Sequence, residues 1–120
     1  MIRIEEIKWL SKEDAEAEVW LSDGCYKLLC FAHPYKPEFE NGGYFLHTLG
    51  ADHIVRSLKE EFEVQQINET FSHYLTGKLI DIKEKIIKVG EFNIYLDNFL
   101  PGDLVEEMFL SFSCERIDLD

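Results

Sequence analysis

The sequence lacks any hydrophobic run long enough to cross a bilayer, since no stretch approaches the ~18 consecutive apolar residues that a membrane helix needs. The first residues, Met1 to Glu6, alternate apolar and charged side chains and contain no apolar signal core. These two absences predict a cytoplasmic protein that does not enter a membrane.

Cysteine is also scarce, because the chain contains only three, Cys25, Cys30 and Cys114. An odd number of cysteines in apolar sequence surroundings argues against a disulfide framework. Cys25 and Cys30 would face opposite sides of one strand and could not pair with each other. We therefore expect three free, buried thiols in a reducing compartment.

Positive charge is sparse: 12 lysines and arginines stand against 24 aspartates and glutamates, which gives a net charge of −12. Binding to nucleic acid or to anionic headgroups needs clustered cations, so the charge of the chain argues against both kinds of partner. Solubility is the simplest role for so much negative charge. A basic protein partner is the alternative.

Motifs that carry chemistry are missing as well. The chain has no CxxC, no G-x-S-x-G, no phosphate-binding glycine loop and no calcium-loop spacing. The four histidines, His33, His47, His53 and His73, form neither an HxH nor a helical pair that would hold a metal. We predict no catalytic residues, no cofactor and no metal. A tertiary cluster of Cys30, His33 and His47 stays possible, and a deep pocket with both histidines and a carboxylate would favour an enzyme.

The composition and the side-chain alternation predict one β-rich domain over residues 1–120. With 46% hydrophobic and 13% aromatic residues, a chain of 120 residues can bury a substantial core. Apolar side chains alternate with charged ones in residues 15–22, and residues 25–31 are apolar on both sides, as in a central strand. Asp23-Gly24 between these runs predicts a type I′ hairpin turn.

Further strands are expected along the rest of the chain, and only one helix. Ser57 and Glu60 fit a capping box, which predicts a helix over residues 57–68. The other expected strands cover residues 2–10 with an irregularity near Glu5-Glu6, 44–49 and 51–56 interrupted at Gly50, 74–82, 86–96 with a bulge at Gly90, and 108–119.

Six or seven short strands indicate an all-β fold, either a small antiparallel β-barrel or, as the alternative, a β-sandwich. Glycines at positions 50, 77 and 90 favour the barrel, because a small barrel coils its strands sharply at corners.

The segments 74–79, 88–94, 100–103 and 112–119 resemble the strand pattern of OB-like barrels. Together with segments 20–24 and 31–34, they also resemble small bacterial proteins of uncharacterised function. The resemblance implies an OB-like barrel and supplies no catalytic residues. Barrels of this kind that bind nucleic acid need a cationic groove, and the charge of this chain departs from that requirement.

Aromatic residues are the best candidates for a binding site. Tyr35 and Phe39 fall in a loop rich in proline and glycine, Tyr44 follows it, and Trp20 lies on the charged side of its strand. We predict partner-binding roles for these four residues, the alternative being that the loop folds down and closes one end of the barrel.

The predicted function is a non-enzymatic binding module that holds a basic protein on its acidic surface, in the manner of an immunity protein or an inhibitor. The alternative is an OB-like barrel that binds single-stranded nucleic acid or another oligomer through exposed aromatic rings. An open strand edge also makes a homodimer possible.

Overall fold

The computed structural model describes all 120 residues and contains eleven strands and one 3-10 helix. The all-β class expected from the sequence is confirmed. In chain order the elements are β1 (Arg3–Ser11), β2 (Glu16–Ser22), β3 (Lys27–Ala32), η1 (Pro37–Asn41), β4 (Leu46–Leu49), β5 (Asp52–Arg56), β6 (Glu63–Gln66), β7 (His73–Asp81), β8 (Ile86–Val89), β9 (Phe92–Tyr95), β10 (Phe109–Cys114) and β11 (Arg116–Leu119). The one helical segment, η1, is five residues long, so no helix in the structure could cross a bilayer.

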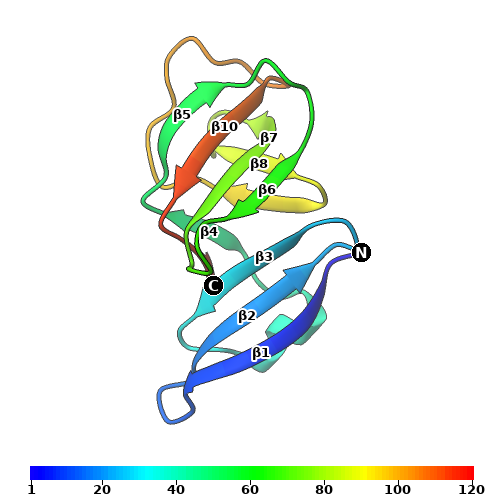
Figure 1. Cartoon of the computed structure of the whole chain (residues 1–120), viewed down its shortest axis with the longest axis vertical. Coiled ribbons are helices and arrows are strands. Elements are labelled where there is room, and N and C mark those ends of the chain that lie inside the picture. Colours follow the sequence, from blue (N-terminus) through cyan, green and yellow to red (C-terminus); the bar gives the residue numbers. More distant parts are fainter.

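All strands belong to one mixed sheet with the order β1-β2-β3-β11-β4-β9-β8-β7-β10-β5, and β6 pairs with β7 outside this path. The β3–β11 and β4–β9 pairs are parallel and the others are antiparallel. In Figure 1, β1, β2 and β3 form one layer, and the strands from β4 to β10 curl above it. No ladder closes the sheet, and the strands outnumber the expected six or seven, so a barrel is not confirmed.

The C-terminal strand joins the two parts of the sheet. It is broken at Glu115, whose backbone N–H donates to the carbonyl of Leu49, so the single strand expected over residues 108–119 is two strands. Before the break β10 pairs with β7 and β5, and after it β11 pairs with β3 and β4. The change of neighbours brings β11 between the first three strands and the rest.

The helix expected over residues 57–68 is wrong. Residues 63–66 form β6 instead, and the residues before them form bends. Leu58, the first large apolar residue of this segment, is 96% exposed, so the segment lacks the packing neighbour that a short helix needs. The Ser57 hydroxyl donates to the carbonyl of Lys59 and accepts from its N–H, a local turn that replaces the helix cap.

The hairpin between β2 and β3 is confirmed, but its turn is not type I′. Asp23 pairs with Tyr26, which centres the turn on Gly24 and Cys25, and of these two only Gly24 has a positive φ. The Asp23 carboxylate accepts from the N–H of Cys25 and of Tyr26 and closes the turn from the side chain. Cys25 consequently lies exposed in the turn and is not buried as expected, while Cys30 and Cys114 are buried and all three thiols are free.

Two of the three glycines expected at barrel corners lie elsewhere in the structure, one in a hairpin turn and one inside a strand. Gly90 lies in the β8–β9 hairpin turn rather than in a bulge, because Val89 pairs with Phe92. Gly77 lies inside β7, where an added Cβ would come 2.5 Å from the carbonyl oxygen of Lys88. Gly50 forms the corner between β4 and β5, which the Asp97 carboxylate holds by accepting from its N–H at 2.7 Å.

Two further expectations, an irregularity in the first strand and a central position for β3, are confirmed. The strand irregularity near Glu5-Glu6 is confirmed, since the pairing of β1 with β2 shifts between Ile4 and Glu6. β3 lies centrally between β2 and β11, as its apolar sequence predicted.

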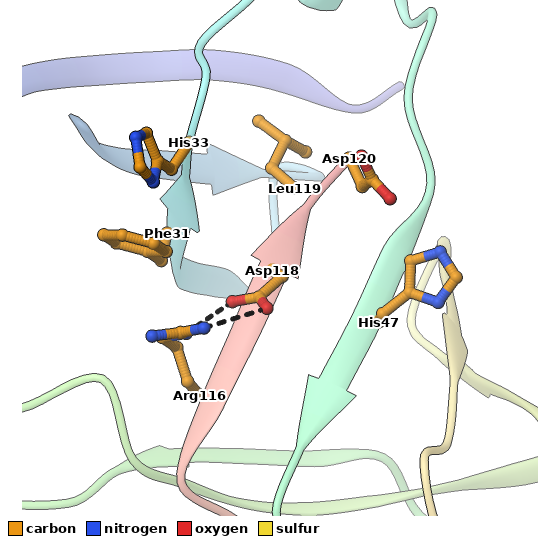
Figure 2. Close-up of a pocket in the computed structure, with 7 residues that line it drawn as sticks. All are labelled: Phe31, His33, His47, Arg116, Asp118, Leu119 and Asp120. Carbon is orange, nitrogen blue, oxygen red and sulfur yellow. Dashed lines mark hydrogen bonds and ion pairs between the residues drawn. The ribbon is translucent and has the colours of Figure 1, made fainter. Parts of the chain in front are cut away.

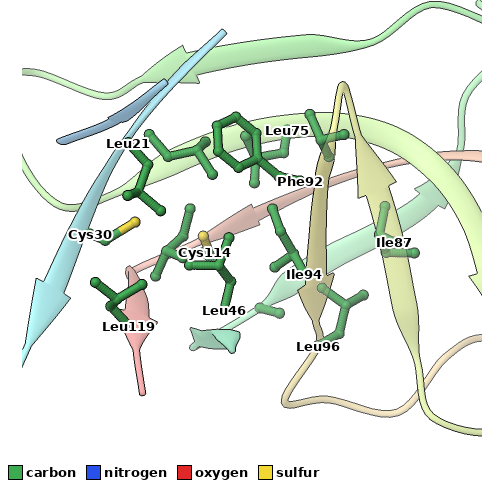
Figure 3. Packing of buried hydrophobic residues seen from close by; sticks show 14 of the residues in the cluster. Leu21, Cys30, Leu46, Leu75, Ile87, Phe92, Ile94, Leu96, Cys114 and Leu119 are labelled. Atoms are coloured by element: carbon green, nitrogen blue, oxygen red, sulfur yellow. The ribbon is translucent and has the colours of Figure 1, made fainter. Parts of the chain in front are cut away.

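One continuous core connects both parts of the sheet. Figure 3 shows Leu21 and Cys30 of the first strands with Phe92 and Leu119 of the later ones, in a cluster of 23 buried hydrophobic residues.

A buried histidine adds a polar link between the two parts. His73 in β7 is 0% exposed, and its Nδ1 lies 2.8 Å from the carbonyl of Phe71. A carbonyl only accepts, so Nδ1 carries the hydrogen, and Nε2 accepts from the N–H of Leu29 in β3.

Candidate partner-binding surface

The aromatic loop between β3 and β4 folds onto the core. Phe39 in η1 is 1% exposed, and its ring makes edge-to-face contacts with Tyr35 and Tyr44, with centroids 5.4 and 6.2 Å apart. Trp9 of β1 continues the stack against Tyr35 at 5.5 Å. Burial raises the pKa of both tyrosines, Tyr35 and Tyr44. Tyr35, Phe39 and Tyr44 are thus brought together, but their rings pack against one another and against the core. Phe39 is buried, so its ring is not on the surface.

Trp20 does not join this stack. It is half-buried on the other face of β2, where its pairing partners are Glu6 of β1 and Leu29 of β3. The structure therefore separates the four expected binding residues into a packed group of three and one residue on the opposite sheet face.

The sheet face on the side of Trp20 carries a row of polar and aromatic residues across five strands. Cross-strand neighbours share a face, so the pairing register aligns these side chains. The row contains Glu18 of β2, Phe31 of β3, Asp118 of β11, His47 of β4 and Tyr95 of β9. We use the name β11 face for the part of this surface formed by Phe31, His33, Phe45, His47, Tyr95, Arg116, Asp118 and Asp120.

Arg116 is the only arginine or lysine of the β11 face, and its charge is engaged within the chain. Its guanidinium donates to both carboxylate oxygens of Asp118, at 2.5 and 3.2 Å, and lies over the Phe31 ring at 4.4 Å from the centroid (Figure 2). Phe31 also makes an edge contact with Phe71 at 5.7 Å. The arginine is thus fixed by a carboxylate and an aromatic ring at the same time.

A hollow of about 290 Å³ lies over this pair, and it unites the two histidines that the sequence left apart. Phe31, His33, His47, Arg116, Asp118, Leu119 and Asp120 line it. In Figure 2, His33 and His47 lie on opposite sides of the Arg116–Asp118 pair.

His33, His47 and two carboxylates, Asp118 and Asp120, therefore line one hollow, which is the combination that the sequence analysis named as favouring an enzyme if it lay in a deep pocket. The lining also offers ion pairing and stacking. Its walls include no serine, threonine or cysteine that could act as a nucleophile. Cys30 points into the core, so it does not meet His33 and His47, and no three His, Cys, Asp or Glu side chains lie close enough to hold a metal ion.

The other half of the β11 face is aromatic. Phe45 is 60% exposed, and its ring meets Tyr95 edge-on at 5.8 Å, while His47 stacks on Tyr95 at 5.3 Å. Asp120 lies directly across from Phe45, because each backbone N–H donates to the carbonyl of the other, at 2.8 and 3.0 Å. A second hollow, of about 420 Å³, is lined by Ile2, Gly42, Tyr44, Phe45, Leu46, Glu91, Asn93 and Tyr95.

Sequence reasoning did not select Phe45, Tyr95 or Arg116, and it considered His47 only together with Cys30 and His33, since the residues of the β11 face come from segments that are far apart in the chain. The alternation of β4 could have placed Phe45 and His47 on one face, but the parallel neighbour β9 has no local signal. Comparison of the chain with protein-family models, with curated proteins and with solved structures found no match in any of the three.

Proposed function

We propose that this protein is a non-enzymatic binding module that holds a basic protein partner on its β11 face. An immunity-like or inhibitor-like role toward a cationic protein fits this chemistry. The observation that supports it most is Phe45, a large aromatic side chain that is 60% exposed and lies across from Asp120.

The charge of the protein and its exposed aromatic side chain agree with this proposal. The net charge of −12 would speed association with a cationic protein, because long-range attraction raises the rate of encounter. Exposed aromatic side chains are typical centres of protein interfaces, where they supply buried apolar area, and the carboxylates around them set the preferred sign of the partner.

The test compares capture by three forms of the protein. The wild type, Phe45→Ser and Phe99→Ser are immobilised, exposed to lysate of the source cells at low and high salt, and the retained proteins are identified by mass spectrometry. Phe99 is the matched control, because it is an 88% exposed phenylalanine outside the β11 face. We expect a basic protein that the wild type and Phe99→Ser retain at low salt and that Phe45→Ser loses. Equal retention by all three forms at both salt concentrations would contradict the proposal.

Single-stranded nucleic acid is the second candidate, and the observation that favours it is the exposed ring of Phe45 with the half-buried ring of Tyr95 beside it. The nearby carboxylates of Asp118 and Asp120 oppose it, because they would repel the phosphate backbone. Fluorescence anisotropy with short labelled DNA and RNA strands at low salt decides between the two. Binding that Phe45→Ser abolishes would favour nucleic acid over a basic protein.

We also propose that the strands after β3 form an OB-like barrel. In the path β4-β9-β8-β7-β10-β5 the two end strands follow each other in the chain across Gly50, which curls the path back toward its start. Nuclear Overhauser contacts between the backbone of β5 and a strand on its open side would support closure. If all amides on the edge of β5 exchange rapidly with solvent, the barrel is not closed there.

A cytoplasmic location is part of the proposal, and the three free thiols fit it, because cysteines stay reduced in the cytosol.

A further inference from the structure

The protein contains its own example of how an arginine can bind to the β11 face. The Arg116 guanidinium rests on the Phe31 ring, and its N–H groups donate to both oxygens of Asp118. A planar guanidinium suits this arrangement, since it can stack on a ring and form a forked pair with a carboxylate. The aromatic ring comes from β3 and the carboxylate from β11, the neighbouring strand.

The same two chemical groups occur on the other side of β11. Phe45, immediately before β4, lies across from Asp120, as Phe31 of β3 lies across from Asp118. Tyr95 stands beside Phe45 as an aromatic wall, at 5.8 Å between the ring centroids. No lysine or arginine of the chain pairs with Asp120 or lies over Phe45, so this second set is accessible to a cation from outside.

We infer that Phe45, Tyr95 and Asp120 form a binding site for an arginine side chain of the partner. The inference rests on the proposed function and specifies which group of a basic protein the β11 face recognises. The guanidinium would stack on Phe45 and donate to the Asp120 carboxylate, and the hollow beside Phe45, of about 420 Å³, has room for the methylene groups that precede it.

Arginine suits the site better than lysine or an anion. A lysine ammonium is more strongly hydrated and cannot form the flat, forked contact that Arg116 shows. An anion would meet the Asp120 carboxylate beside Phe45, whereas Glu91, in the wall of the adjoining hollow, is paired with the Met1 ammonium at 2.8 Å. The Asp120 carboxylate therefore selects a cation, and the aromatic rings of Phe45 and Tyr95 select a planar one.

The test uses N-acetyl-arginine amide as the probe and N-acetyl-citrulline amide as its neutral analogue of nearly the same shape. Each is titrated to millimolar concentration into the labelled protein while the aromatic and amide NMR signals are recorded. We expect saturable shifts at Phe45, Tyr95 and Asp120 with arginine, weaker shifts with N-acetyl-lysine amide and none with citrulline.

Variants identify the residues responsible. Phe45→Leu and Asp120→Asn should each weaken arginine binding by about two- to fivefold, the range expected for one exposed cation–π or ion-pair contact. Phe99→Leu and Asp103→Asn are matched controls on exposed residues outside the β11 face and should bind as the wild type does. All four positions are exposed, so the fold is kept, and circular dichroism verifies this.

The outcomes separate this inference from the proposed function. Equal shifts with citrulline and arginine, or arginine shifts that Phe45→Leu and Asp120→Asn leave unchanged, would overturn the arginine site. If a basic partner is still captured through Phe45 in that case, the binding module stands and only the recognised group is wrong. Arginine binding at Phe45 without any captured partner would support the site and count against the protein partner.

Discussion

The carboxylate of Asp23 accepts a hydrogen bond from the backbone N–H of Glu91, 68 positions later in the chain, with 2.9 Å between Oδ2 and N. Its other oxygen accepts from the N–H of Cys25 at 2.8 Å and of Tyr26 at 2.7 Å. One side chain therefore closes the β2–β3 turn and attaches it to the β8–β9 turn. Gly90 makes the approach possible, since a Cβ there would lie almost on Asp23 Oδ2.

Replacing Asp23 should loosen both turns. Asp23→Ala removes the acceptor of three backbone N–H groups, and we expect it to lower the free energy of unfolding by about 2–4 kcal/mol, because hydrogen bonds to a charged group are strong and unpaired donors are costly. Urea unfolding measures the change. Asp103→Ala is the control, since that exposed carboxylate forms no hydrogen bond or ion pair, and it should stay within about 0.5 kcal/mol of the wild type. A similar loss in both variants would show that the Asp23 contacts do not stabilise the fold.

His73 should make stability depend on pH near neutrality. Burial lowers its pKa below the ordinary value of 6.5, and the hydrogen bond to the Phe71 carbonyl only partly offsets this. Protonation then costs more in the folded than in the unfolded chain, so stability is complete above pH 6.5 and decreases as pH falls through 6.5 toward the lower folded pKa. Urea unfolding between about pH 7.5 and about pH 5 measures this loss.

His73→Gln separates this effect from the other histidines. It should reduce the slope of stability against pH, whereas His53→Gln, at an exposed position, should keep it. Burial raises the pKa of the Asp23 carboxyl but its backbone donors outweigh this and hold the pKa below 3.8, so its stabilising contribution is lost only at lower pH. A slope near neutrality that persists in His73→Gln would contradict the assignment.

Gly77 should tolerate no side chain. In Gly77→Ala the new methyl group would lie 2.5 Å from the carbonyl oxygen of Lys88 and 2.7 Å from a side-chain carbon of Ile87, which forces β7 and β8 apart. We expect a loss of about 1–3 kcal/mol in the free energy of unfolding, the usual cost of overpacking. Gly102→Ala is the control, because a Cβ there meets nothing within 4 Å. Thermal unfolding of the two variants checks the difference, and equal stability would show that the strands can separate without cost.

The three thiols should differ sharply in reactivity. Burial raises the pKa of Cys114 to about 12 and that of Cys30 still higher, whereas Cys25 is exposed in its turn. A thiolate is the reactive form, so we expect one fast-reacting thiol in the native protein and three after unfolding. Titration with a coloured disulfide reagent counts them, and Cys25→Ser should abolish the fast phase. Fast labelling of Cys30 or Cys114 would mean that the core opens readily.

Local patterns predicted the strands well and their connections poorly. The alternation of Ala17, Val19 and Leu21 correctly identified a buried face, because side chains of a strand point to opposite sides in turn. The helix over residues 57–68 failed although Ser57 and Glu60 fit a capping signal, since a helix also needs a neighbour to cover its apolar side. Gly90 was misassigned for a related reason: a hairpin turn and a bulge look alike until the pairing of Val89 with Phe92 is known.

The all-β class, the central position of β3 and the strongly negative charge could be read from the residues in order, because side-chain period and ionisable groups are properties of the linear chain. Which strands became neighbours depended on the packing of the folded molecule. β3 meets β11 and β4 meets β9 in parallel, and such pairs join distant segments through hydrogen bonds that any sequence can form. Phe45, Tyr95 and Asp120 consequently share one surface through the packing of the whole chain, which no short stretch of residues specifies.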